Sequence, residues 1–151
     1  MRRITFSAAA LGMGLAAATA LADVTPAVEA RQGQFKLFAF NVGPMAQMAQ
    51  GAIEYDAEVA GTAAANLAAL VSVEQARLWP EESDNETVEG TRALPGIWDD
   101  LEDFASKFSD LQMAVADLEG AAGEDADALR GALGPVAAAC SACHEDYRAP
   151  Q

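Results

Sequence analysis

The chain has 151 residues and a strongly acidic balance, with 23 aspartates and glutamates against nine lysines and arginines, for a formal charge of −14. This length suits one domain. The charge argues against nucleic-acid binding, because neutralising phosphates requires a basic face. A docking partner would be expected to offer a basic patch, although acidity also serves solubility by itself.

Residues 1–22 have the pattern of a secretory signal peptide. Two arginines precede an apolar run rich in alanine, leucine and glycine, and Ala20-Leu21-Ala22 fits an A-x-A cleavage site. The apolar run is too short to span a membrane, and no other long apolar stretch follows. We therefore predict a mature domain over 23–151 with no membrane span and, in a bacterium, a periplasmic location. Loss of Arg2 and Arg3 would take the formal charge from −14 to about −16.

The first predicted helix runs from about Thr25 to Gln50. Its inward stripe advances in alternating steps of three and four, as an amphipathic helix requires: Val28, Arg31, Phe35, Phe38, Val42, Met45 and Ala49. Gly43-Pro44 is expected to kink or briefly interrupt this helix.

The second and third predicted helices are separated by a polar, acidic loop that reaches about Ala93. The second runs from about Ile53 to Leu78 and buries Ala60, Ala63, Leu67, Leu70 and Val71. The third has Pro95 in its first turn. Its stripe is Ile97, Leu101, Phe104, Phe108, Leu111, Val115 and Leu118. Two tryptophans that flank the loop, Trp79 and Trp98, are interpreted as packing residues.

The fourth predicted helix begins near Glu124, after a short glycine turn. The same stepping predicts its inward face: Leu129, Leu133, Val136, Cys140, Cys143 and Tyr147. Gly134-Pro135 predicts a kink, or a restart with the proline in the first turn.

Cys140-Ser141-Ala142-Cys143-His144 is typical of covalent haem c attachment. Positions three apart lie on one side of a helix, so both thiols can reach one edge of a flat ring. The chain has one histidine, so only His144 can supply an imidazole ligand to iron. A redox dithiol, half a zinc site and a short disulfide are the alternatives. They are weaker, because no strand pattern or further ligand accompanies the motif, and a disulfide closing so short a loop would stabilise little.

Four helices with short connections predict an all-α fold, an antiparallel up-down-up-down four-helix bundle that houses a covalently bound haem in its core.

The chain also resembles the class II c-type cytochromes, and the cytochrome c′ family in particular. The resemblance lies in residues 140–148, in Arg31 to Lys36, and in Leu94-Pro95-Gly96-Ile97-Trp98. It implies a four-helix bundle with the haem motif near the C-terminus. It also implies that Phe35 faces the open side of the iron, where family members with methionine are six-coordinate electron carriers and those with an apolar residue are five-coordinate.

Other site residues follow from the same resemblance. It implies that Arg31 pairs with a haem propionate, with a further hydrogen bond from Gln32, and that Arg148 borders the proximal haem face. Each role has an alternative. The Arg31 side chain could reach solvent instead, Arg148 could complement the dipole of its helix, and Phe35 could be an ordinary core residue. Met45 lies roughly 15 Å along the helix axis from Phe35, too far to bind the same iron. Met48 and Met113 are interpreted as packing residues.

The resemblance implies a periplasmic haem protein whose five-coordinate iron binds nitric oxide and carbon monoxide, in nitric oxide binding or protection. The alternative is an electron carrier of a respiratory or photosynthetic chain. Enzymatic peroxidase chemistry is disfavoured, since Phe35 offers no acid–base group. A homodimer through the first two helices is also implied, with a small-residue face for close packing: Ala57, Gly61, Ala64 and Ala68.

Overall fold

The computed structural model describes residues 23–150, so the predicted signal peptide, residues 1–22, lies outside the described residues. Within that range the elements are α1 (Thr25–Ala49), α2 (Ala57–Val71), the 3₁₀ helix η1 (Ala76–Leu78), α3 (Gly96–Asp99), α4 (Leu101–Ala121) and α5 (Ala126–Tyr147). The four long helices pack α1 on α2, α2 on α4, α4 on α5 and α5 on α1. The predicted all-α, antiparallel four-helix bundle is confirmed.

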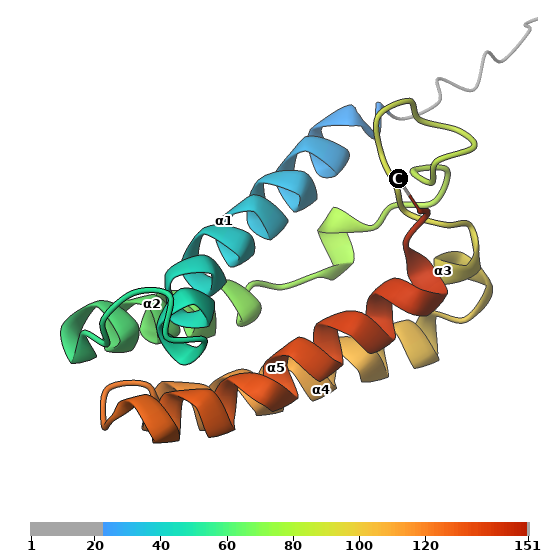
Figure 1. Cartoon of the computed structure of the whole chain (residues 1–151). Helices are drawn as coiled ribbons and strands as arrows, with labels where there is room; N and C mark the ends of the chain where they lie inside the picture. Colours follow the sequence, from blue (N-terminus) through green and yellow to red (C-terminus); the bar gives the residue numbers. More distant parts are fainter. Residues whose placement is uncertain (1–22, 151) are drawn as a thin grey trace, which may run out of the picture.

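The bundle is not uniformly closed. Figure 1 shows α4 and α5 running side by side, whereas α1 diverges from α5 toward the end where the C-terminus lies. The long segment between η1 and α3 covers that end. The opening between α1 and α5 is where the site described below is found.

Aspartates decide where three of the helices begin. Asp56 caps α2, accepting hydrogen bonds from the amides of Glu58 and Val59 at 2.9 and 3.0 Å. Asp100 and Asp125 cap α4 and α5 in the same way. Such side chains satisfy amides that the helix leaves without partners, and their charge suits its N-terminal dipole.

These caps correct two predicted boundaries. The second helix is shorter than predicted, because its cap stands at Asp56 and it ends at Val71, with only the single turn of η1 beyond. The third is divided by the non-helical backbone of Asp100 into the short α3 and the long α4. Leu101 consequently starts a new helix and is 54% exposed, so its predicted burial is wrong.

Both inner prolines are accommodated within continuous helices. Pro44 lies inside α1 and Pro135 inside α5, so the predicted restart at Pro135 is not found. Pro135 and Gly131, four residues before it, are both exposed. The carbonyl that the proline leaves unbonded therefore lies on the wet side of the helix, where water can satisfy it.

Two small residues of α2, Gly61 and Ala64, pack against other parts of this chain. Ala64 is 0% exposed, and a Cβ on Gly61 would lie 3.8 Å from the Cα of Gly123 in the turn after α4. Of the small-residue face predicted for a dimer, Ala64 is therefore not available to a partner, whereas Ala57 is exposed and its role stays a prediction. Small side chains let two backbones approach closely in either setting, so the pattern alone cannot distinguish them. Among the described residues, no helix is both long and apolar enough to cross a bilayer.

Candidate functional site

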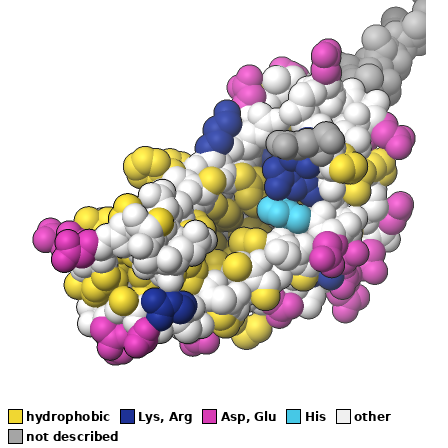
Figure 2. Space-filling model, in the orientation of Figure 1, with side chains coloured by type: hydrophobic (Ala, Val, Ile, Leu, Met, Phe, Trp, Pro, Cys, Tyr) yellow, Lys and Arg dark blue, Asp and Glu magenta, His cyan; other side chains and the backbone are white. Residues whose placement is uncertain are grey.

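A cavity of about 540 Å³ lies between α1, α4 and α5, and residues 90–93 together with Trp79 close one side of it. Its walls are mostly aromatic and aliphatic, including Phe38 from α1 and Phe104 and Phe108 from α4. Figure 2 shows this hydrophobic hollow with the histidine at its edge and basic side chains beside it. An apolar hollow with a few polar groups at its rim is the usual form of a cofactor site.

Helix α5 brings the motif residues to the cavity. Cys140 and Cys143 are free, half-buried thiols, and both line the cavity together with His144. Burial raises the pKa of the Cys143 thiol to about 11 and also raises the pKa of Cys140. Desolvation by partial burial lowers the pKa of His144, and the cations of Arg148 and Arg92 lower it further. This shift favours the neutral imidazole, which is the form that binds a metal.

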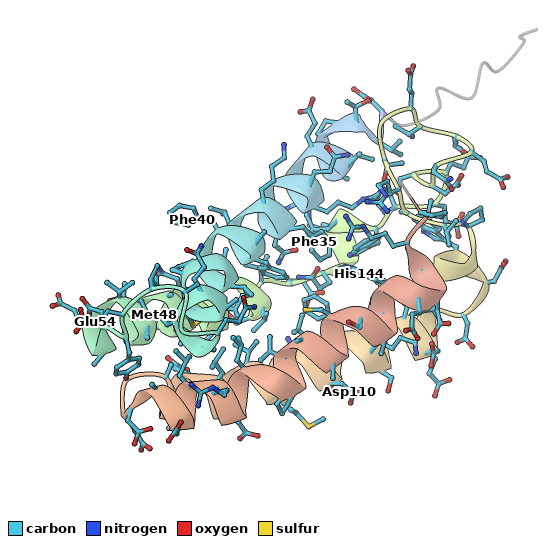
Figure 3. All side chains as sticks on the ribbon, viewed as in Figure 1. Phe35, Phe40, Met48, Glu54, Asp110 and His144 are labelled. Carbon is cyan, nitrogen blue, oxygen red and sulfur yellow. The ribbon has the colours of Figure 1, made fainter. Side chains whose placement is uncertain are left out.

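Phe35 faces His144 across the cavity. Figure 3 shows the two side chains projecting toward one another, Phe35 from α1 and His144 from α5. The Phe35 ring packs edge-on against Phe38 and Trp79, with centroid distances of 5.4 and 6.3 Å. Phe35 is thus half-buried, held by aromatic neighbours and presented to the cavity rather than sunk in the core.

Methionine is not found on the cavity wall within residues 23–150. Met45 is fully buried in the main core and does not line the cavity, and Met48 is buried in the same core. Met113 is 61% exposed on α4, so its predicted packing role is wrong.

Arg31 and Gln32 both bind the segment between η1 and α3. The Arg31 guanidinium donates to Ser83 Oγ at 2.8 Å, to Thr91 Oγ1 at 2.9 Å, and to the carbonyls of Leu78 and Ser83. Gln32 Nε2 donates to the Gly90 carbonyl at 2.9 Å. Both residues also line the cavity, so their pairing with a propionate stays a prediction.

Arg148 is exposed, lines the cavity and directly follows α5. It forms an isolated antiparallel bridge with Ala93, which ties the chain end to the segment before α3. Arg148 and His144 line the same cavity, and the place of Arg148 at the proximal haem face stays a prediction.

A charged pair at the cavity wall is missed by the sequence. Lys107 of α4 lines the cavity and pairs with Asp146 at 2.9 Å and with Asp103 at 3.7 Å. Asp103 also accepts a hydrogen bond of 2.6 Å from the Tyr147 hydroxyl. The spacing of Asp103 and Lys107 is a visible helical pair, but the contact with Asp146 depends on how α5 packs on α4.

Comparisons with known proteins agree on one family. Residues 26–148 match the family described as Cytochrome C′. Cytochrome c-554 from Cereibacter sphaeroides is 45% identical over 121 residues, which are 80% of this chain and 91% of that protein. The solved cytochrome c′ from Rhodobacter Spheriodes is 38% identical, with a TM-score of 0.83 over 86% of this chain and 100% of that chain.

Two further solved relatives carry diatomic ligands. A ferrous variant of cytochrome c prime from Alcaligenes xylosoxidans with bound nitric oxide is 32% identical, with a TM-score of 0.74 over 87% of this chain and 99% of that chain. A carbon monoxide-bound variant of the same protein is 34% identical, with a TM-score of 0.73 over 85% and 98% of the two chains.

Haem c is the cofactor of the matched family, and the residues present here fit it. The apolar walls suit a macrocycle, and the chain's two cysteines are the thiols that covalent attachment needs. The neutral imidazole of His144 suits iron, and arginines at the rim suit carboxylates.

Proposed function

The chain belongs to the cytochrome c′ family, and on that premise we propose that it is a periplasmic haem c protein that binds nitric oxide and carbon monoxide at five-coordinate iron, in nitric oxide binding or protection. One observation carries this proposal: His144 and Phe35 face one another across an apolar cavity whose described wall contains no methionine. The bound haem would supply an iron that accepts one imidazole and one small ligand.

The two faces of the cavity then have different tasks. Cys140 and Cys143 hold the cofactor against α5, and His144 is the only protein ligand. Phe35 on the opposite face carries no donor atom, so it occupies space without binding iron. Ligands that need no hydrogen bond from the protein are favoured at such a site, and the relatives with bound nitric oxide and carbon monoxide support this choice.

We also propose that the chain is not an enzyme. A peroxidase requires a group that moves protons beside the bound oxidant. Phe35 is a hydrocarbon and its two ring neighbours, Phe38 and Trp79, offer no base. Gln32 and Arg148 are assigned to the rim of the cofactor, where they can contact its carboxylates.

The absorption and electron paramagnetic resonance spectra of the purified holoprotein test the proposal. The ferric form should be high-spin or spin-mixed near neutral pH, because only His144 binds from the protein. Carbon monoxide should bind the ferrous form without first displacing a side chain. A low-spin ferric spectrum with a methionine–iron charge-transfer band would overturn the proposal.

Electron transfer is the second candidate, and the position of His144 favours it. His144 is exposed at the cavity edge, so a cofactor bound there would lie close to the surface. The acidic surface would then suit a redox partner with a basic patch. Five-coordinate iron argues against fast electron transfer, because a change of ligation or spin state adds to the reorganisation energy. The same spectra therefore separate the two candidates.

The periplasmic location rests on the N-terminal pattern. We expect the exported protein to begin at Asp23, because an A-x-A site ends at Ala22. N-terminal sequencing of the periplasmic protein checks this expectation. Recovery of a chain that still begins with Met1 would mean that the segment serves as an anchor.

We propose a homodimer that uses an apolar patch on α1 and α2. Phe40 is 75% exposed and points away from the cavity (Figure 3). Phe40 lines a groove of about 310 Å³ with Pro44 and Val59, and Leu37 is exposed nearby on α1. Exposed apolar patches of this kind often mark protein interfaces.

Phe40→Asp should convert the dimer to a monomer in sedimentation experiments, because it places a charge in an apolar contact. Met113→Asp makes the same kind of change at an exposed position on α4 and should leave the dimer intact. An unchanged sedimentation coefficient for Phe40→Asp would rule out this surface.

A further inference from the structure

Arg31 is a buried cation whose partners are neutral. Its side chain is 2% exposed, and its recorded hydrogen bonds go to hydroxyls and carbonyls of residues 78–91. Ser83, one of these partners, is itself fully buried and donates through Oγ to the Pro80 carbonyl at 2.7 Å. Burying a charge is costly unless its hydrogen bonds are made. Here the segment between η1 and α3 makes them.

Arg31 also contacts an aromatic ring that leads to Phe35. Its guanidinium carbon lies 4.6 Å from the ring centroid of Trp79, within the range of a cation–π interaction. Trp79 packs edge-on against Phe104 at 4.7 Å and against Phe35 at 6.3 Å. Its carbonyl accepts a hydrogen bond of 3.2 Å from Trp98 Nε1. Trp79 therefore contacts both the Arg31 guanidinium and the Phe35 ring.

We propose that Arg31 is a positioning residue that fixes residues 79–93 and, through Trp79, holds Phe35 over the ligand side of the cavity. The ligand-entry half rests on the proposed function, in which Phe35 shields the open iron position. Arg31 thereby controls ligand entry without touching the ligand. The rigid fork of its guanidinium matters here, because it reaches several acceptors at once, whereas a lysine ammonium would reach fewer.

A role in pairing with a propionate would leave a different signature. That role depends on positive charge at the cofactor edge, so lysine would largely replace arginine and Ser83 would be irrelevant. The positioning role depends on the hydrogen-bond fork, so lysine would fail and loss of the Ser83 hydroxyl would act in the same direction. The holoprotein with Arg31→Lys, Arg31→Gln, Ser83→Ala and the double variant Arg31→Gln/Ser83→Ala separates the two.

The first measurement is hydrogen–deuterium exchange of amides in residues 80–93. We expect about tenfold faster exchange in Arg31→Lys and Arg31→Gln, the change that loss of one hydrogen bond to a charged group would produce. Ser83→Ala should show a smaller change and should add little to Arg31→Gln. Arg77→Gln removes the same charge from an exposed position in η1 and should leave exchange unchanged. Ser83→Ala keeps the test valid if the Arg31 variants fold poorly.

The second measurement is the association rate of carbon monoxide with the ferrous protein. It should rise in the Arg31 variants, and Arg31→Gln should add nothing once Phe35 is alanine. Wild-type exchange and association rates in Arg31→Lys would overturn the positioning role. A low-spin, methionine-ligated spectrum of the unaltered protein would overturn the proposed function and the ligand-entry half of this inference. The exchange data would still decide whether Arg31 holds residues 79–93.

Discussion

Phe35→Ala is expected to accelerate carbon monoxide association with the ferrous protein by about tenfold or more, which corresponds to about 1.4 kcal/mol off the entry barrier. Phe35 is half-buried, faces His144 and is held edge-on by Phe38 and Trp79. Alanine would remove the ring and leave its space open to a ligand. Stopped-flow mixing or flash photolysis measures the rate.

Met113→Ala is the control for that experiment, since it shortens an exposed apolar side chain that lies outside both the cavity and the proposed dimer contact. Its association rate should equal that of the unaltered protein. Equal rates in Phe35→Ala and the unaltered protein would show that Phe35 does not shield the site. Phe35→Met should move the ferric spectrum toward low spin, provided that the backbone lets the sulfur reach the iron.

Loss of either thiol is expected to abolish normal covalent attachment of the cofactor. Cys140 and Cys143 are the chain's only cysteines, and both line the cavity from α5. A serine hydroxyl cannot replace a thiol in forming the thioether. In Cys140→Ser and Cys143→Ser, intact-mass spectrometry of periplasmic protein should show the loss of the doubly attached haem c adduct that the unaltered protein carries.

The same variants should be less stable, because the apolar walls of the cavity would lose the surface that covers them. Burial of apolar area contributes about 25 cal/mol per Å², so uncovering the apolar wall would cost several kcal/mol. Thermal unfolding followed by circular dichroism measures this loss. Ser141→Ala changes an exposed residue between the two cysteines and should affect neither mass nor stability. A complete haem adduct on both cysteine variants would contradict the attachment site.

The approximate bounds of α1 and the inward face of α5 could be predicted from the sequence, because both depend on local spacing. The first helix was predicted from Thr25 to Gln50 and extends from Thr25 to Ala49. On α5, Leu129, Leu133 and Val136 are buried, and the two cysteines on the same stripe line the cavity. A helix of 3.6 residues per turn converts such spacing directly into a face.

Other features required the packed chain. Asp100 divides the predicted third helix, because its side chain caps α4. Leu101 therefore lies in the first turn of α4, where it is exposed. The small residues of α2 looked equally suitable for a neighbouring copy and for another part of the chain. The burial of Ala64 and the approach of Gly61 to Gly123 show that these two residues pack within the chain.

By itself, the sequence determined the helical class, the haem-binding motif on the inward face of α5, and the presence of a single histidine. These features depend on residue type and on separations of a few positions. The tertiary structure decided which residues meet across long separations: Phe35 opposite His144, Lys107 beside Asp146, and Arg31 with Ser83 and Thr91. Such contacts depend on how α1, α5 and residues 79–93 close around one cavity, and helical periodicity carries no information about that closure.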